Sequence, residues 1–279
     1  MKRRSIRLTK KIIKFLLVIL FIGMIIFPFY WQVITSLKDP ADISKIPTDL
    51  WPTRFSLEFY RNVFTHYKFE IYLKNSVIVG TVTMLISILI AVPAAYAFVR
   101  IDFKFKKFWK NFLLIANMFP IIAMVSPLFV FFKKYNLINT YAGLIIPSVM
   151  ITLPLAIWTL IAFISKIPIE LEEAASVDGT TRFQSIILIL LPLMGPGLFS
   201  TAIISFITAW NELMFSLLMV TKNAMRTVPV GISMFSGQYT VPWGDMSAAS
   251  IVSTLPIIIV VLIFQKKIVA GLTAGAVKG

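Results

Sequence analysis

One acidic side chain of this 279-residue chain lies within a long apolar stretch, and it is the first candidate for chemistry. Glu212 ends the triplet Trp210-Asn211-Glu212. Burying charge in a bilayer is costly, so an ionisable residue in a span indicates an ion or substrate pathway. A proton-coupled carrier usually has several such residues in pairs, and a lone Glu can also reach the interface. A proton-coupled carrier acting through Glu212 therefore stays open as an alternative.

The residue types of catalytic and metal centres are scarce. The chain has no Cys, and His66 is its only His, which excludes a thiolate site and a multi-His metal site. It has no Gly-x-x-x-x-Gly-Lys-Ser/Thr loop to hold the phosphates of ATP. No carboxylate pair or Ser/His pair suggests hydrolysis. We therefore expect neither an enzyme nor a cofactor or metal in this chain.

A polar stretch at residues 170–182 has a more specific design. It separates two apolar runs that are each long enough to cross a bilayer. Pro168 suits the first turn of a helix, and acidic side chains are favoured where that helix begins. Three acids stand there: Glu170, Glu172 and Glu173. Asp178-Gly179 then predicts the end of the helix, and Thr180 or Thr181 can cap the next one.

The predicted helix has one small apolar face. Ile167, Leu171 and Ala174 fall at i, i+4 and i+7, and Ala175 keeps the surface shallow. So short a helix has nothing of its own to bury that face against. A groove on another protein would cover it. Packing on the chain's own spans, or lying in the lipid interface, would cover it equally well.

The same stretch resembles the EAA loop in membrane subunits of binding-protein-dependent ABC importers. That motif reads Glu-Ala-Ala, three residues, Gly, nine residues, Ile, one residue, Leu-Pro. The chain matches every fixed position at this spacing: Glu173-Ala174-Ala175, Gly179, Ile189 and Leu191-Pro192. The resemblance implies that the loop at about 165–190 forms a coupling helix that docks on a cytoplasmic ATPase. The coupling residues would be Glu170, Leu171, Glu173, Ala174, Ala175, Asp178 and Gly179.

Composition places the chain in a membrane. It is 58% hydrophobic and 14% charged, against about 45–50% apolar and about 25% charged for soluble domains. A net charge of +15 would suggest nucleic acid as a partner in a soluble protein. Membrane topology explains this charge better, so no nucleic acid is expected.

Six spans are expected, at about 15–34, 75–99, 112–132, 141–164, 195–218 and 246–265, with 184–194 leading into the fifth. With both termini inside, 17 of the 27 Lys and Arg residues lie on the cytoplasmic side, as the positive-inside rule predicts. We therefore expect an all-α, multi-pass protein of the cytoplasmic membrane. The resemblance implies the type I (MetI-like) ABC importer permease fold. One permease domain would cover 1–279, with its core at about 72–266 and a cytoplasmic tail at 267–279.

The resemblance extends to the carbohydrate-importer branch of this family. Asn75-Ser76, the triplet that ends in Glu212, and the tail 271–279 are similar to the maltose-type permease. It implies that the tail, through Thr273, Gly275 and Lys278, reaches the ATPase interface. Composition alone would make this tail a frayed end. The implied partners are a second permease in a heterodimer, two ATPase subunits that bind ATP and Mg²⁺, and an extracytoplasmic sugar-binding protein.

The expected function is import of a maltose- or trehalose-like oligosaccharide by alternating access. Sugar sites stack sugars on aromatic rings and bind hydroxyls with amides or acids. The candidate pathway residues are Asn117, Trp210, Asn211 and Glu212, each of which also suits helix packing. Glycerol-3-phosphate importers share the same design, so that substrate stays open. A membrane scaffold without transport is a further alternative.

Overall fold

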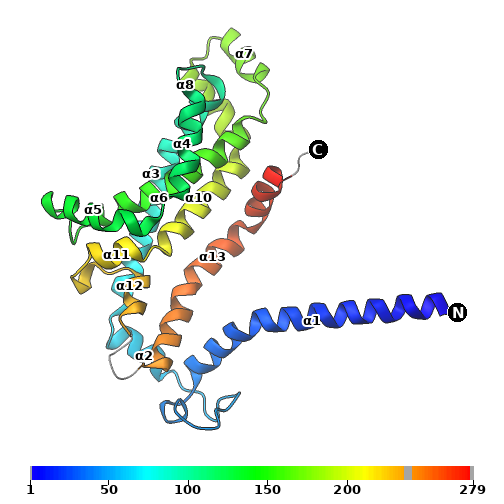
Figure 1. Cartoon of the computed structure of the whole chain (residues 1–279), viewed down its shortest axis with the longest axis vertical. Coiled ribbons are helices and arrows are strands. Elements are labelled where there is room, and N and C mark those ends of the chain that lie inside the picture. Colours follow the sequence, from blue (N-terminus) through cyan, green and yellow to red (C-terminus); the bar gives the residue numbers. More distant parts are fainter. Residues whose placement is uncertain (1, 236–240, 277–279) are drawn as a thin grey trace. The chain divides into compact units, whose positions relative to one another are not determined.

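The computed structural model describes the backbone of residues 2–235 and 241–276 and the side chains of 10–235 and 241–265. The described chain is almost entirely helical (Figure 1). It divides into two compact units, Met1–Phe69 with Met234–Thr254, and Glu70–Ser233 with Leu255–Gly279. The prediction of a single permease domain over 1–279 stays a prediction.

The first unit is built from the N-terminal part of the chain and a later segment, Met234–Thr254. It contains α1 (Lys2–Leu37), η1 (Pro40–Asp42), α2 (Glu58–Thr65) and the beginning of α13 (Trp243–Ala276). Phe59 and Val63 of α2 are buried. A Cβ on Gly244 would lie 2.2 Å from the ring of Phe59, so α13 approaches α2 here only because the residue is Gly.

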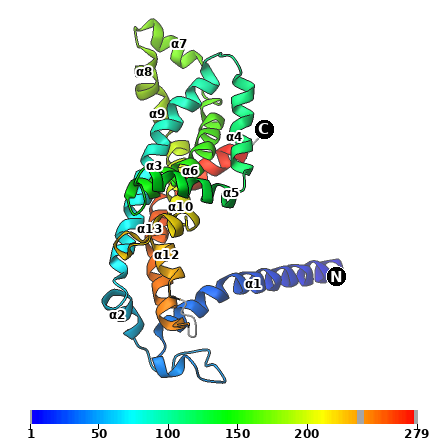
Figure 2. The ribbon, with the colours of Figure 1, turned by 60° about the vertical axis from the view of Figure 1, so that its left-hand side comes forward.

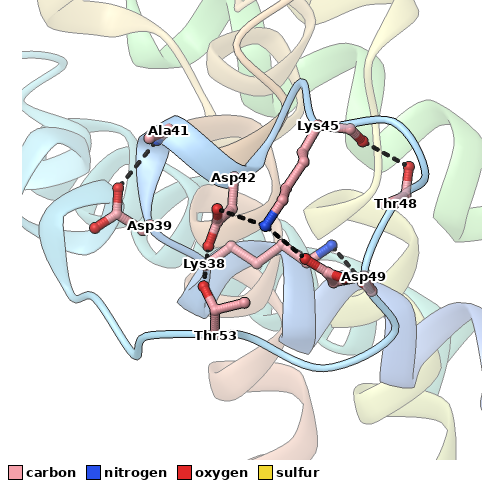
Figure 3. A network of polar contacts seen from close by, with 8 residues as sticks. All are labelled: Lys38, Asp39, Ala41, Asp42, Lys45, Thr48, Asp49 and Thr53. Carbon is pink, nitrogen blue, oxygen red and sulfur yellow. Dashed lines mark hydrogen bonds and ion pairs between the residues drawn. The ribbon is translucent and has the colours of Figure 1, made fainter.

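Lys38 is the buried charge of the loop that follows α1 (Figure 3). Its ammonium donates to the carbonyl of Asp49 at 2.7 Å and lies 4.8 Å from the ring centre of Trp31. A buried ammonium needs such partners because it has left water. Lys38 also forms an isolated antiparallel bridge with Phe55. Lys38 therefore holds the loop at two points, at Asp49 through its side chain and at Phe55 through its backbone.

The exposed side of the same loop is held by a group of charges (Figure 3). Lys45 lies 3.3 Å from Asp49 and 3.7 Å from Asp42. Its hydrogen bond to Asp49 and the two nearby carboxylates raise the pKa of Lys45. Asp42 also accepts the hydroxyl of Thr53. These contacts are solvent-exposed, so they order the loop more than they stabilise the fold.

The single His of the chain lies in a polar pocket of this unit. His66 and Tyr67 follow α2, and the pocket also contains Asn62 and Asp245. The carboxylate of Asp245 accepts from Asn62 Nδ2 at 3.2 Å and from the Tyr67 hydroxyl at 3.3 Å. Burial, followed by the nearby Asp245 carboxylate, raises the pKa of Tyr67. His66 itself is exposed.

The second unit holds the remaining elements. They are α3 (Phe69–Arg100), α4 (Lys106–Met118), α5 (Ile121–Lys134), α6 (Tyr141–Ile164), α7 (Glu170–Val177), α8 (Arg182–Ser185), the π-helical η2 (Ile186–Leu190), α9 (Leu191–Leu193), α10 (Gly195–Trp210), α11 (Met214–Met219), η3 (Asn223–Met225) and α12 (Val228–Ser233). Its core joins α3 to α6 through Ala91, Ala95, Ala156 and Leu160, all fully buried. Small residues allow helices to approach closely in lipid.

Four uninterrupted helices are long and apolar enough to cross a membrane. They are Lys10–Leu37, Phe69–Arg100, Tyr141–Ile164 and Trp243–Gln265, and they coincide with the first, second, fourth and sixth expected spans. Two further helix pairs are bent, Lys106–Met118 with Ile121–Lys134 by 94° and Arg182–Leu193 with Gly195–Trp210 by 84°. The described residues therefore provide four spans, or up to six if each bent pair is one span.

The third and fifth expected spans were wrong as continuous helices. The third breaks at Phe119 and Pro120, where the proline cannot donate the backbone hydrogen bond that a continuing helix needs. The fifth was expected to run to residue 218, but α10 ends at Trp210 and α11 begins at Met214. Both breaks turn the chain within an apolar run.

Candidate functional site

The loop singled out by the sequence folds as predicted at its backbone. Helix α7 runs from Glu170 to Val177, Asp178 is its C-cap, and Gly179 has φ +85°. Thr181 then caps α8 in a reciprocal pair of contacts with Gln184. The acidic first turn, the glycine end and the threonine cap are thus confirmed, whereas Pro168 lies before the N-cap Ile169 and not in the first turn. Figures 1 and 2 show α7 and α8 together at one end of the second unit.

The faces of α7 differ from the expectation at two residues. Ile167, expected on the apolar face, precedes the helix and packs against the core of the unit. Glu172 and Ala175, three residues apart, are the buried positions of the helix. Leu171 and Ala174 are exposed, and Val177 is 88% exposed. The expected docking face grouped Ala175 with Leu171 and Ala174, but Ala175 faces its own chain. The free apolar surface of α7, which we call the α7 face, consists of Leu171, Ala174 and Val177.

Sequence reasoning missed the residue that holds α7 in place. Arg100, in the last turn of α3, donates from Nε to Glu172 Oε1 at 2.7 Å and from Nη2 to the carbonyl of Ile167 at 2.6 Å. The two side chains are only 11% and 9% exposed. Tyr96 lies beside Glu172 as well. In the sequence, Arg100 is merely the first of several basic residues in a cytoplasmic loop.

Glu212 has a structural role in this conformation. Its carboxylate accepts the backbone N–H of Phe215 at 2.7 Å, the N–H of Ser216 at 3.0 Å and the Ser216 hydroxyl at 2.8 Å. These are the free donors at the start of α11, which an acidic side chain commonly caps. Glu212 is buried and its oxygens are occupied. The geometry thus gives no support to a proton carrier acting through this residue.

The other candidate pathway residues do not gather around Glu212. Trp210 is 3% exposed and packs on Phe206, with ring centres 5.6 Å apart, so it is unable to stack on a sugar here. Asn211 is exposed just after α10. Asn117 is also exposed and donates to the carbonyl of Leu113 at 3.0 Å. Trp210, Asn211 and Glu212 therefore lie at the break between α10 and α11 and do not form a sugar site together.

Asn117 instead borders a cavity of about 140 Å³ between α6 and α10. Hydroxyl side chains line that cavity: Thr152, Thr159, Thr201, Ser205 and Thr208. Enclosed ligand pockets usually measure about 300–1,000 Å³, so this one is a polar wall rather than a complete sugar site. Sequence reasoning missed these residues because Ser and Thr are common at helix contacts in membranes. Their spacing of four and three along α10 is the available signal.

The segment Asn75-Ser76, which is similar to the maltose-type permease, makes hydrogen bonds within this chain. Asn75 donates to the carbonyls of Ala224 and Arg226 at 3.0 and 2.9 Å and accepts the Tyr141 hydroxyl at 2.7 Å. Ser76 accepts the N–H of Val228, the first residue of α12, at 2.8 Å. This pair anchors the chain after α11 to α3.

The predicted tail contacts lie mostly beyond the described side chains. Thr273 and Gly275 belong to the helical backbone of α13, which is described to Ala276, and Lys278 lies outside the described residues. The role of this tail stays a prediction.

Comparison with known proteins decides the family. Residues 77–273 match the family model described as binding-protein-dependent transport system inner membrane component. The chain belongs to this family. The match contains all of α7 and the loop around it, and the coupling role of Glu173-Ala174-Ala175 and Gly179 stays a prediction. As a member of this family, the chain is a multi-pass membrane subunit of an ABC transport system and not an enzyme.

Individual relatives cover nearly the whole chain of this family member. It is 43% identical to the trehalose/maltose transport system permease protein MalG of Thermococcus litoralis, over 97% of this chain and 98% of the relative. It is 41% identical to the trehalose transport system permease protein SugB of Mycobacterium tuberculosis, over 93% and 95%. A 35% identical relative is the sulfoquinovosyl glycerol transport system permease protein SmoH of Agrobacterium fabrum, over 91% and 89%.

A solved structure supports the fold of this permease. The crystal structure of a bacterial ABC transporter involved in the import of the acidic polysaccharide alginate matches 91% of this chain and 95% of its own, with a TM-score of 0.79. Sequence identity is 20%, so this likeness shows the fold alone.

Proposed function

We propose that this chain is a permease subunit of an ATP-driven ABC importer that moves a sugar into the cell by alternating access. The observation that carries the proposal is the 43% identity, over 97% of the chain, to a trehalose/maltose permease. A second relative that covers most of the chain also bears the name of a trehalose permease. We therefore infer a maltose- or trehalose-like oligosaccharide as the substrate.

The proposed assembly follows from the family. The partners are a second permease in a heterodimer, two ATPase subunits that bind ATP and Mg²⁺, and an extracytoplasmic sugar-binding protein. In this assembly the chain has six spans and both termini in the cytoplasm, with each bent pair counted as one span. The excess of Lys and Arg in the expected inside segments supports that orientation.

In the proposed mechanism, the α7 face enters a cleft on one ATPase subunit. Leu171, Ala174 and Val177 present apolar surface, and Glu170 and Glu173 flank it with charge that can orient the docked helix. A short apolar helix face in a groove is a common mode of recognition. Asp178-Gly179 sets the angle at which α7 leaves the membrane-facing segments. When the ATPase subunits close on ATP, α7 follows them.

The hydroxyl-lined wall between α6 and α10 is the part of this subunit that we assign to the sugar pathway. Sugars carry hydroxyl donors and acceptors, and Asn117, Thr201 and Ser205 offer the complementary groups at one cavity. Trp210, Asn211 and Glu212 contribute indirectly, since they shape the break between α10 and α11. The partner permease would supply the opposite wall.

The absence of Cys allows a direct test of ATPase docking. A single Cys replaces Ala174 or Val177, a thiol-directed crosslinker is added to native membranes, and the captured protein is identified. We expect capture of a cytoplasmic ATPase that ATP shifts or releases. Ser176→Cys is the matched control, because Ser176 is exposed on α7 but lies outside the α7 face. Efficient labelling at Ala174 by a cytoplasmic thiol reagent, with no ATPase captured, would contradict the docking proposal.

A transport assay separates the importer from the remaining alternatives. Vesicles that contain the assembled complex should take up trehalose or maltose when ATP is supplied on the ATPase side. Uptake that depends on a proton gradient without ATP would favour the carrier instead. Uptake of glycerol 3-phosphate in preference to disaccharide would replace the proposed substrate but would still support an ATP-driven importer. No uptake of any of these, with ATP hydrolysis unaffected by substrate and binding protein, would favour a scaffold.

A further inference from the structure

We propose that Arg100 and Glu172 form the mechanical link that carries the movement of α7 into α3, and that both are positioning residues for coupling ATP hydrolysis to transport. We call Arg100, its two partners Glu172 and Ile167, and the neighbouring Tyr96 the Arg100 clamp. The inference rests on the proposed function, because it requires an ATPase that moves α7.

The geometry of the clamp resists both sliding and rotation. The guanidinium of Arg100 reaches two points on the loop, the carboxylate of Glu172 at 2.7 Å and the carbonyl of Ile167 at 2.6 Å. Ile167 precedes α7 and Glu172 lies in its first turn. A planar guanidinium that holds two acceptors fixes orientation as well as distance. The start of α7 is therefore tied rigidly to the end of α3.

The surroundings make this ion pair strong compared with an exposed one. Arg100 lies in the last turn of α3 and Glu172 in the first turn of α7, so each charge has the sign that its helix end favours. Both side chains are mostly buried, which limits screening by water and salt. Removing one partner would leave the other charge buried without compensation. Glu172 belongs to the clamp, whereas Glu170 and Glu173 of the same helix are exposed.

The chain itself joins α7 to α6 through the short non-helical segment 165–169, and Arg100 also holds this segment at the carbonyl of Ile167. Toward α10 the chain passes through Gly179 at φ +85°, the π-helical segment Ile186–Leu190 and an 84° bend. The clamp reaches α3 without any of these. Within the described part of the second unit, Arg100–Glu172 is the one ion pair that joins α7 to a membrane-spanning helix.

Helix α3 leads directly from the clamp into the core of the unit. Tyr96 stands one turn before Arg100, and Ala95 and Ala91 follow further along, in the same buried cluster as Ala156 and Leu160 of α6. Packed helices transmit displacement because protein interiors are dense and deform little. A pull on Glu172 is thus delivered to α3 and, through the core, to α6, which lines the hydroxyl wall.

A clamp that only stabilises the fold and a clamp that transmits motion predict different results. In the first case, weakening it lowers the yield of assembled complex but leaves the coupling of the surviving complex unchanged. In the second, the complex assembles and hydrolyses ATP, but less sugar moves for each ATP. The informative quantity is therefore the number of ATP molecules hydrolysed per sugar imported.

The test uses the complete complex in lipid vesicles, with its binding protein and trehalose or maltose as the substrate. Glu172→Gln keeps the size of the side chain and removes its charge, and Arg100→Lys keeps the charge but removes the planar guanidinium that holds two acceptors at once. We expect each to raise the ATP used per sugar by at least about fivefold, the lower end of typical coupling between sites. Asp102→Asn and Lys104→Gln are the matched controls, since both residues are exposed and lie close to Arg100 in the chain. The exchange Arg100→Glu with Glu172→Arg should restore part of the coupling.

The outcomes separate the clamp from the importer itself. One result would overturn the proposed role of the clamp and leave the importer function intact. In that result the wild-type complex imports sugar with ATP, and Glu172→Gln and Arg100→Lys use the normal number of ATP molecules per sugar. The clamp would also be overturned if Glu172→Gln failed to assemble while Arg100→Lys assembled and coupled normally. Wild-type complex without ATP-driven uptake would instead remove the proposed function on which the inference rests.

Discussion

The carboxylate of Glu212 holds Ser216 by both its backbone N–H, at 3.0 Å, and its hydroxyl, at 2.8 Å. One side chain thereby caps the start of α11, just after α10 ends, inside an apolar run. The sequence suggested that Glu212 could belong to a proton pathway, but in the structure its side chain caps a helix where the backbone turns. The donors at a helix start would be unpaired in lipid without such a cap.

Replacing Glu212 should therefore cost stability more than it changes the energy source. We expect Glu212→Ala to lower the free energy of unfolding by about 1–2 kcal/mol, the usual loss for an N-cap. Glu212→Gln should lose less, because its amide oxygen still accepts one N–H. Thermal unfolding of the purified complex measures both. Sugar uptake by Glu212→Gln should stay driven by ATP, and abolition of uptake at unchanged stability would return Glu212 to the transport pathway.

Gly179 should be intolerant of a β-branched side chain for a conformational reason. Its φ is +85°, yet a Cβ there would meet nothing within 4 Å. Left-handed backbone costs a residue with a side chain about 1–2 kcal/mol, so Gly179→Val should change the turn and misdirect α7. We expect ATP hydrolysis and membrane insertion to persist while sugar uptake falls.

Gly23→Ala is the matched control for that experiment. Gly23 also has open space around it but lies in α1 without a positive φ. The Gly23→Ala variant should insert into the membrane and import sugar like the wild type. Normal sugar uptake by Gly179→Val would show that the turn does not set the position of α7.

The absence of a side chain at Gly197 allows α10 to pack closely against Phe163 of α6. A Cβ on Gly197 would lie 2.3–2.6 Å from three atoms of the Phe163 ring. Overpacking of this kind usually costs about 1–3 kcal/mol, so Gly197→Val should lower the thermal unfolding temperature. Phe163→Leu in the same chain should recover part of the loss. No recovery in the double variant would show that the strain lies elsewhere.

The sequence predicted α7 well because its signals are local. Pro168, the acids of the first turn and Gly179 all lie within a few residues of the helix ends that they determine. The clamp could not be predicted in the same way. Arg100 and Glu172 are 72 residues apart, and each charge already has a local explanation, one in the positive-inside rule and the other in the helix dipole. Only the fold brings them together.

The breaks in the expected third and fifth spans were missed for a related reason. Hydropathy detects an apolar run but does not distinguish a continuous helix from one bent by 94° at Phe119 and Pro120 or one interrupted between Trp210 and Met214. Pro120 was visible, but proline is frequent in membrane helices and often only kinks them. At Glu212, polarity alone could not separate a helix cap from a proton relay. The side of α7 on which Ala175 lies likewise depends on what the helix packs against.

Asn117 should affect substrate handling and not the ATPase. It borders the hydroxyl-lined cavity and makes one described hydrogen bond, to the carbonyl of Leu113 within its own helix. Asn117→Leu would remove an amide that can bind sugar hydroxyls. We expect the KM for sugar uptake to rise roughly tenfold, equivalent to losing about 1.4 kcal/mol of binding. Unchanged KM together with unchanged substrate preference would exclude Asn117 from the pathway.

The loop after α1 offers a last test, in which two neighbouring lysines should behave differently. Lys38 is fully buried and donates to the carbonyl of Asp49 at 2.7 Å, so Lys38→Met should leave that carbonyl without its partner. A buried acceptor left unpaired costs about 1–3 kcal/mol, and the thermal unfolding temperature of the complex should fall accordingly. Lys45→Gln removes an exposed ion pair with the same Asp49, and solvent screening should make its effect undetectable. Equal losses in the two variants would mean that the exposed ion pair holds this loop as strongly as the buried ammonium does, and would contradict the expected difference.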